Sequence, residues 1–387
     1  MDRLKNTGTN LIYRVKSAME GYSPSEEVVH LLGRRYDLGQ PEEKTRFMES
    51  FGNRVWITYR KDLRLKADEE GLLNSDTGWG CMIRVGQMAL AEALRRFFGL
   101  AEIKDHERLI NIIGAFVDHD DGRSERGVYS IQKIAEKARK HYRTCPGEWY
   151  SPSTISFILK EIHDELPIKN GEGMGFEVFN NSMLYADQLV QAMTGQQACD
   201  CRDIICHRCL MKVPVKPVFF IVLCKVGVQK PLPDCVEVIC RLLEHPCSLG
   251  MIGGRPGKAH YFLGKTHDNR LFFLDPHYVQ SSTSFSELPE KLPSYFCDQI
   301  RSISCGSINP SIGLCFYVAE LEQLHSLMET FRTLKGNKFL HFAKHTDPCL
   351  KRQREEERLK LESTRQQELP QRLDQSALAP SLPIYCP

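Results

Sequence analysis

The residue of this sequence best suited to do chemistry is a cysteine that directly follows a Gly-Trp-Gly run. Cys81 comes after Gly78, Trp79 and Gly80, and an apolar, helix-like segment begins with it. The first N–H groups of a helix and its dipole favour negative charge, so a thiol placed there is expected to react as a thiolate. The two glycines allow a tight entry turn. Most cysteines are simply small buried apolar residues, but this placement favours a nucleophile.

A thiol nucleophile needs a base, and the segment LFFLDPH offers one. Asp275 and His277 stand two residues apart at the end of an extended apolar run. Because successive side chains of a strand alternate between its faces, the carboxylate and the imidazole are expected on the same side. There the acid could orient the imidazole, or both groups could converge on one thiol. Asp-Pro-His alone is a weak signal, and its combination with Cys81 is what indicates thiol catalysis.

A buried helix and several strands must position these residues. The segment 81–98 carries its polar residues Arg84, Gln87 and Arg95 near one stripe, and its other faces are apolar. We therefore expect a helix that lies mostly buried at the centre of a domain and ends at Gly99. β-Branched and aromatic residues predict strands elsewhere. The expected strands are 55–60, 216–226, and the pair 259–264 and 270–277 joined across KTHDN; a helix is expected at 234–246, and a strand followed by a helix at 315–334.

Composition bounds the class of protein. The 387 residues are 42% hydrophobic and 26% charged, and the formal net charge of +2 gives no clustered basic excess, so we expect no nucleic-acid partner. The N-terminus lacks the apolar core of a signal peptide, and no apolar stretch is long enough for a transmembrane helix. Fifteen cysteines without a secretory signal indicate a reducing compartment, and we expect a cytoplasmic protein.

Four segments together resemble the autophagins, the papain-like cysteine peptidases that process ubiquitin-like autophagy modifiers. These are NSDTGWGCMIRVGQM, GEWYSP, LGMIGGRPGKAHYFLG and FFLDPH, in order within residues 55–318. The resemblance implies an α/β (α+β) papain-like fold with a central antiparallel sheet, a buried catalytic helix and a small inserted subdomain within 100–210. The expected divisions are an N-terminal arm at 1–45, the catalytic domain at 46–345, and a charged, Pro-rich, disordered tail at 346–387.

The resemblance also implies roles for individual residues. Cys81 matches the nucleophile, His277 the general base and acid, and Asp275 the group that orients the imidazole. Tyr59, in WITYR, matches a tyrosine whose hydroxyl helps the backbone N–H of Cys81 to hold an oxyanion; by itself it would be interpreted as a core aromatic residue. The family often has a second cysteine four residues after the nucleophile, but here that residue is Val85.

Two further matches concern access to the thiol. Trp149 resembles the family tryptophan that covers the active site, and Pro256 lies in a loop resembling the one that closes the cleft. Gly253 and Gly254 are expected to let that loop hinge. Substrate binding would then lift the Pro256 loop from Trp149 and open a narrow groove suited to glycine before the scissile bond. Without the surrounding motifs, a core indole and an ordinary turn would be the better interpretations.

The function implied is that of a cysteine endopeptidase that cleaves after the C-terminal glycine of ubiquitin-like autophagy modifiers. It would mature the precursor and release the modifier from phosphatidylethanolamine. The expected partners are the modifiers in both forms, with transient contact to autophagic membranes through the lipidated substrate, and no cofactor or metal is expected.

Three alternatives stay open. The chain could be a catalytically silent scaffold that binds the modifier, or a transglutaminase-like acyltransferase that uses the same triad. It could also be a zinc-dependent binding module, since four thiols so close together can bind Zn²⁺. The thiols concerned, with a neighbouring histidine, are Cys199, Cys201, Cys206, Cys209 and His207.

Overall fold

The computed structural model describes residues 21–23, 25, 27–66, 71–100, 105–118, 126–166, 173–196 and 213–346. The thiol-rich segment 199–209 and the tail beyond residue 346 lie outside the described residues, so the predictions made for them stay predictions. Within the described ranges, no helix is both long and apolar enough to cross a membrane.

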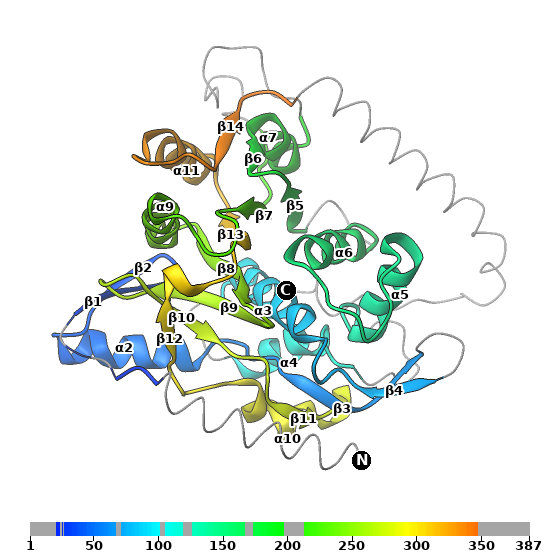
Figure 1. The fold of residues 1–387 in the computed structure, drawn as a ribbon. Coiled ribbons are helices and arrows are strands. Elements are labelled where there is room, and N and C mark those ends of the chain that lie inside the picture. Colours follow the sequence, from blue (N-terminus) through cyan, green and yellow to red (C-terminus); the bar gives the residue numbers. More distant parts are fainter. Residues whose placement is uncertain are drawn as a thin grey trace.

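A nine-stranded sheet forms the centre of the molecule (Figure 1). Its main path runs through β12 (Ser302–Ser304), β10 (Arg270–Leu274), β9 (Lys258–Lys265), β8 (Ser248–Arg255), β13 (Ser311–Val318), β7 (Val218–Lys225) and β5 (Gly175–Phe179). At one side β1 (Val28–Leu31) pairs with β9, and β2 (Arg34–Asp37) pairs with β1. Neighbouring strands are antiparallel except for the parallel pair β5 and β7. The expected central antiparallel sheet is thus present, and the predicted hairpin is β9–β10.

The helix that begins with Cys81 lies against one face of this sheet. It is α3 (Cys81–Phe97), which contacts β8 and β9 and is buried along nearly its whole length, as predicted. Gly99, with φ +69°, follows its end, as expected for a stop. On its other side α3 meets α4 (His106–Gly114) and α6 (Pro152–Asp164), and α5 (Ile131–Tyr142) packs on α6. The close approach of α6 requires Gly86, because a Cβ there would lie 2.7 Å from a side-chain carbon of Ile155.

A second group of helices packs around a hydrophobic cluster that is separate from the one containing α3. The helices are α7 (Ala186–Thr194), α9 (Pro233–Glu244) and α11 (Leu321–Thr333), and Figure 1 shows them on the far side of the sheet from α4. The helix α2 (Pro41–Gly52) packs beside β2, and a small two-stranded sheet joins β6 (Met183–Tyr185) to β14 (His341–Ala343). The predicted helix at 234–246 is α9, and the predicted late strand and helix are β13 and α11.

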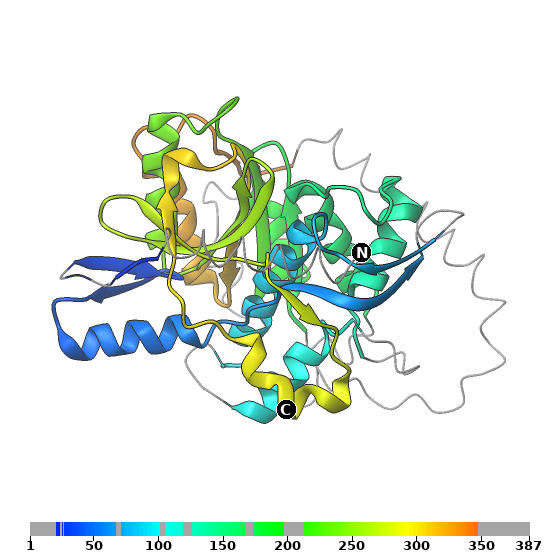
Figure 2. The same cartoon turned by 60° about the horizontal axis from the view of Figure 1, so that its bottom comes forward.

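A three-stranded sheet lies beside the start of α3 (Figure 2). It orders β11 (Val279–Ser281), β3 (Tyr59–Lys66) and β4 (Leu72–Ser75), and β11 runs parallel to β3. Short helices follow at η1 (Phe285–Glu287), α10 (Leu288–Lys291), η2 (Leu292–Tyr295) and η3 (Cys305–Ser307). Since Val279 pairs with Tyr59, this sheet carries the chain just after His277 past Tyr59.

Two boundaries differ from the expectation. The extended segment expected at 55–60 forms a strand only from Tyr59 onward. The sheet also reaches into the expected N-terminal arm at 1–45, because its strands β1 and β2 lie there. Helices α4 to α6 share one hydrophobic cluster with α3, and a separate subdomain within 100–210 stays a prediction.

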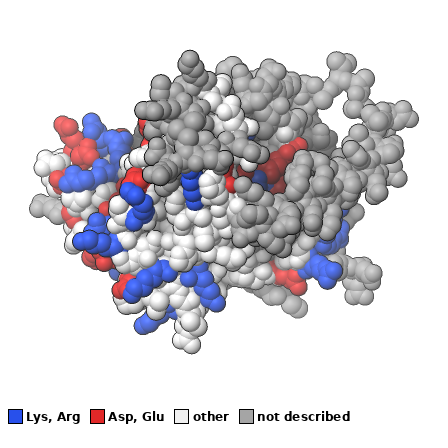
Figure 3. Space-filling model, turned by 90° about the horizontal axis from the view of Figure 1, so that it is seen from above, with Lys and Arg blue, Asp and Glu red and all other residues white. Residues whose placement is uncertain are grey.

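On the described part of the face in Figure 3, charged side chains of both signs lie mainly toward the rim.

Candidate active site

A buried aspartate builds the turn that leads into α3. The backbone N–H groups of Trp79 and Gly80 both donate to the carbonyl oxygen of Asp76, at 3.2 and 2.9 Å. The Asp76 side chain folds over the same turn, and a Cβ on Gly80 would lie 2.5 Å from its Oδ2. Glycine is therefore required at position 80, and the turn delivers Cys81 as the first residue of the helix. The unpaired N–H groups of that first turn surround the thiol with positive potential.

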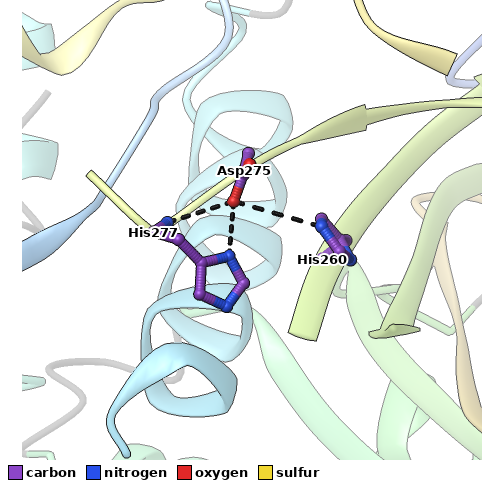
Figure 4. Close-up of side chains that lie close together, drawn as sticks. All are labelled: His260, Asp275 and His277. Atoms are coloured by element: carbon purple, nitrogen blue, oxygen red, sulfur yellow. Dashed lines mark hydrogen bonds and ion pairs between the residues drawn. The ribbon is translucent and has the colours of Figure 1, made fainter. Parts of the chain in front are cut away.

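Asp275 and His277 lie on the connection between β10 and β11 and contact each other. The Nδ1 atom of His277 is 2.5 Å from Oδ1 of Asp275, and the same oxygen accepts the His277 backbone N–H at 3.1 Å (Figure 4). The expectation that the two side chains share one side is confirmed, although β10 itself ends at Leu274. Because Nδ1 is engaged by the carboxylate, Nε2 is the ring nitrogen left for Cys81, whose interaction with His277 favours the imidazolium.

Burial and pairing set the charges of this group. Burial disfavours the imidazolium, yet the hydrogen bonds to Asp275 and Cys81 outweigh it and raise the pKa of His277 to about 9. Burial likewise opposes ionisation of Asp275, but the hydrogen bond and charge of His277, with the charge of Arg301, hold the pKa of Asp275 well below its usual range. At neutral pH the pair is therefore a carboxylate and an imidazolium, and the imidazolium interacts with the side chain of Cys81.

Two residues that the sequence did not single out hold Asp275. Nη1 of Arg301 donates to Oδ2 of Asp275 at 3.1 Å, and the guanidinium is itself fixed by Gln299 at 2.8 Å and by the hydroxyl of Tyr278. The indole N–H of Trp56 donates to the Asp275 carbonyl oxygen at 2.8 Å. These contacts join segments far apart in the chain, and no local pattern marks either residue, so only the fold reveals them.

The structure brings Tyr59 to the same place. Its ring lies edge-on to the His277 ring, with centroids 5.4 Å apart, and its backbone N–H donates to the Pro276 carbonyl at 2.9 Å. Tyr59 is buried, with 2% of its surface exposed. Of the predicted site residues, Cys81, Asp275, His277 and Tyr59 thus converge.

The residues expected to gate access lie in two separate settings. Trp149 is 46% exposed, in the segment before α6. Pro256 and Gly257 form the exposed turn between β8 and β9. Gly253 and Gly254, expected to hinge this loop, instead lie within β8, paired with β9. A Cβ on Gly254 would lie 1.9 Å from a backbone oxygen of Lys258, so close strand approach explains that glycine, and hinging there would require the ladder to open.

His260, Asp275 and His277 are also residue types that bind metals, and their ligand atoms lie within 4.8 Å of one another. Two ligands of one tetrahedral zinc ion would be about 3.3 Å apart. The 2.5 Å contact between His277 and Asp275 is shorter than that and fits an acid that orients an imidazole. A second group of metal-binding types among the described residues comprises Glu27, His267 and Asp268.

Comparison with known proteins agrees with this geometry. Residues 44–330 match the peptidase C54 catalytic domain. The "Cysteine protease ATG4D" of Xenopus laevis is 28% identical over 378 residues, covering 84% of this chain and 76% of the relative. The "Cysteine protease ATG4B" of Gallus gallus is 26% identical over 323 residues, covering 77% and 78%. The "Cysteine protease ATG4A" of Oryza sativa subsp. japonica is 27% identical over 332 residues, covering 80% and 67%.

Proposed function

Because the chain belongs to the peptidase C54 family and is a cysteine protease of autophagy, we propose that it cleaves after the C-terminal glycine of ubiquitin-like autophagy modifiers. The same chemistry would mature the precursor and release the modifier from phosphatidylethanolamine, since both leaving groups are amines on glycine. The observation that carries the proposal is the contact of His277 with both Asp275 and Cys81.

Each residue of the site has a proposed part in the reaction. The Cys81 sulfur attacks the glycine carbonyl as the thiolate of a thiolate–imidazolium pair with His277, and the backbone N–H of Cys81 with the Tyr59 hydroxyl stabilises the oxyanion. The tetrahedral intermediate collapses as His277 donates its proton to the leaving amine, which produces a Cys81 thioester and a neutral imidazole. His277 then takes a proton from water, which attacks the thioester and releases the glycine carboxylate. Asp275 keeps the imidazole oriented throughout.

Access and location complete the proposal. Movement of the Pro256 turn away from Trp149 would admit the substrate, and a narrow groove would select glycine. Membrane contact would come through the lipidated substrate. A cytoplasmic location is supported by the free thiols among the described residues, which suit a reducing compartment.

The pH dependence of cleavage follows from His277. Its imidazolium must donate the proton to the leaving amine, and its pKa is raised to about 9. We therefore expect kcat/KM to persist through neutral pH and then to fall about tenfold per pH unit above pH 9, as the imidazolium is lost. Initial rates in overlapping buffers between pH 6 and 10.5 would measure this. An alkaline limb centred near the ordinary histidine value of about 6.5 would contradict the proposed charge state.

The direct test is incubation of the purified chain with a panel of ubiquitin-like precursors, followed by mass measurement of the products. The proposal predicts a carboxyl-terminal glycine on an autophagy modifier and a separate C-terminal peptide. A lipidated modifier in vesicles should likewise yield free modifier. Amine incorporation without net hydrolysis would instead identify an acyltransferase, and binding with no product would identify a scaffold.

A further inference from the structure

A second histidine lies beside the catalytic carboxylate with no hydrogen-bond partner of its own. His260 is on β9, and the pairing of Tyr261 with Leu274 makes it the cross-strand neighbour of Asp275. It is 0% exposed, and neither of its ring nitrogens has a hydrogen-bond partner among the described residues. Its Nε2 lies 4.0 Å from Oδ1 of Asp275, beyond hydrogen-bond range (Figure 4). A buried polar group left unpaired costs about 1–3 kcal/mol, so this position requires an explanation.

The surroundings of His260 keep it neutral. Burial, opposed by Asp275, lowers the pKa of His260 to about 3, and the charges of His277, Arg255 and Lys258 act in the same direction as burial. The ring also packs edge-on against Phe273, with centroids 4.6 Å apart. A neutral imidazole retains one N–H donor and one lone pair. His260 therefore cannot compete with His277 for the catalytic proton, but it can still donate a hydrogen bond.

We propose that His260 is a positioning residue that holds Asp275, and through it His277, while His277 is neutral in the thioester intermediate. This inference rests on the proposed roles of Cys81, His277 and Asp275. It assigns no contact with substrate to His260.

The charges around Asp275 explain why a further hydrogen-bond donor near its carboxylate is useful. In the resting enzyme Oδ1 of Asp275 receives a charge-assisted bond from His277, and Oδ2 receives one from Arg301. Once His277 has given its Nε2 proton to the leaving amine, its remaining Nδ1–H bond is an ordinary neutral one and is weaker. The negative charge on Oδ1 of the buried carboxylate is then no longer balanced by a positive charge on His277. The His260 N–H is the group within reach, since a shift of about 1 Å would bring it to hydrogen-bond distance.

Two substitutions of His260 separate this role from packing. His260→Phe keeps an aromatic ring against Phe273 and removes both nitrogens, whereas His260→Gln places an amide N–H close to the position of Nε2. We expect His260→Phe to lower kcat for the modifier precursor about 10- to 100-fold and to lower KM with it, so that kcat/KM changes little, because Asp275 and the imidazole are less well held during hydrolysis of the thioester. His260→Gln should recover most of this loss. Phe262→Leu, at a buried neighbour on the same strand, should lower thermal stability without lowering kcat.

A second measurement identifies which step of the reaction depends on His260. Because the contact forms only when His277 is neutral, hydrolysis of the thioester should slow more than its formation. Intact-mass measurement during turnover should therefore detect acyl-enzyme on Cys81 in His260→Phe but not in the wild-type chain. Alkylation of resting Cys81 by iodoacetamide at neutral pH should proceed at a similar rate in both, since the resting contact of Asp275 with His277 does not use His260.

The possible results distinguish this inference from the proposed function. Unchanged kcat in His260→Phe, or an equal loss in His260→Gln, overturns the positioning role while the wild-type chain still cleaves the precursor. A loss of Cys81 alkylation that parallels the loss of kcat also overturns it, because His260 would then act in the resting state. A wild-type chain that leaves every precursor intact contradicts the proposed function first, and this inference with it.

Discussion

Replacing Cys81 by alanine is expected to lower precursor cleavage at least about 10⁴-fold, because no other group can form the thioester. The change removes one sulfur atom at a fully buried position, so the free energy of unfolding should fall only modestly. Mass-resolved cleavage assays over several days, alongside urea unfolding, would measure both quantities. Retained binding of the precursor by the Cys81→Ala variant would show that its surface is intact.

The matched control is another buried thiol. Cys315, on β13, is as buried as Cys81, but burial raises the pKa of the Cys315 thiol to about 12, so it stays protonated and unreactive. Cys315→Ala should therefore lose some stability and keep its turnover. Cleavage that survives in Cys81→Ala, or that disappears in Cys315→Ala alone, would contradict the assignment of the nucleophile. Cleavage by the Cys81→Ala variant would also argue against a catalytically silent scaffold, because the chain would then cleave the precursor with another residue.

The parts of the site that sequence reasoning reached are those encoded locally. The Gly-Trp-Gly run before an apolar helical pattern correctly placed Cys81 at a helix start. The two-residue spacing of Asp275 and His277 was enough to predict that their side chains lie on the same side, and in the fold they contact each other. The papain-like fold and the cysteine protease class, which the resemblance of four segments implied, are confirmed by the match to the peptidase C54 domain.

What escaped the sequence depends on tertiary packing. Arg301 and Trp56 contact Asp275 from segments 26 and 219 residues away along the chain, and nothing in the sequence around either residue indicates that contact. His260 lay inside a recognised segment, but only the register of β9 against β10 places it beside the carboxylate. Gly253 and Gly254 suggested a hinge because glycine permits motion. In the fold they allow strands to approach closely, and the sequence alone cannot distinguish these two uses of glycine.

The polar residues of α3 also have a structural role that the sequence did not reveal. Arg84 is fully buried, and its guanidinium lies 2.7 Å from an oxygen of Asp76 and 2.6 Å from one of Asp118. Asp76 in turn accepts the backbone N–H of Arg60 at 2.6 Å, and Asp118 accepts that of Ile131 at 2.9 Å. One cation thus ties the helix that carries the nucleophile to its entry turn and to the start of α5.

Loss of that cation should produce the largest change in stability. Arg84→Met keeps the length of the side chain but leaves two buried carboxylates without their counter-charge, so we expect the free energy of unfolding to fall by about 3–5 kcal/mol. Arg332→Met is the matched control, because Arg332 pairs with Glu329 at the same 2.7 Å but is 64% exposed. An exposed pair contributes about 0–1 kcal/mol, and urea unfolding of both variants would measure the contrast.

The pH dependence of the same variant identifies the cause of its instability. Burial already raises the pKa of Asp76 even with Arg84 beside it, and without Arg84 its carboxyl group should accept a proton more readily still. A carboxyl group whose pKa is raised in the folded state stabilises the fold below its unfolded pKa of about 4, and that contribution is lost as pH rises. The difference in the free energy of unfolding between Arg84→Met and the wild-type chain should therefore become smaller toward acidic pH.

Removing the unpaired charges should then restore part of the stability at neutral pH. Asp76→Asn and Asp118→Asn, added to Arg84→Met, eliminate both buried carboxylates with little change in side-chain size. If the combined variant unfolds at the same urea concentration as Arg84→Met, or if Arg84→Met loses no more than Arg332→Met, the buried ion network does not hold the helix in place. If stability returns but Cys81 is alkylated more slowly than in the wild-type chain, the network has a second effect, which is to fix the turn that presents the thiol to His277.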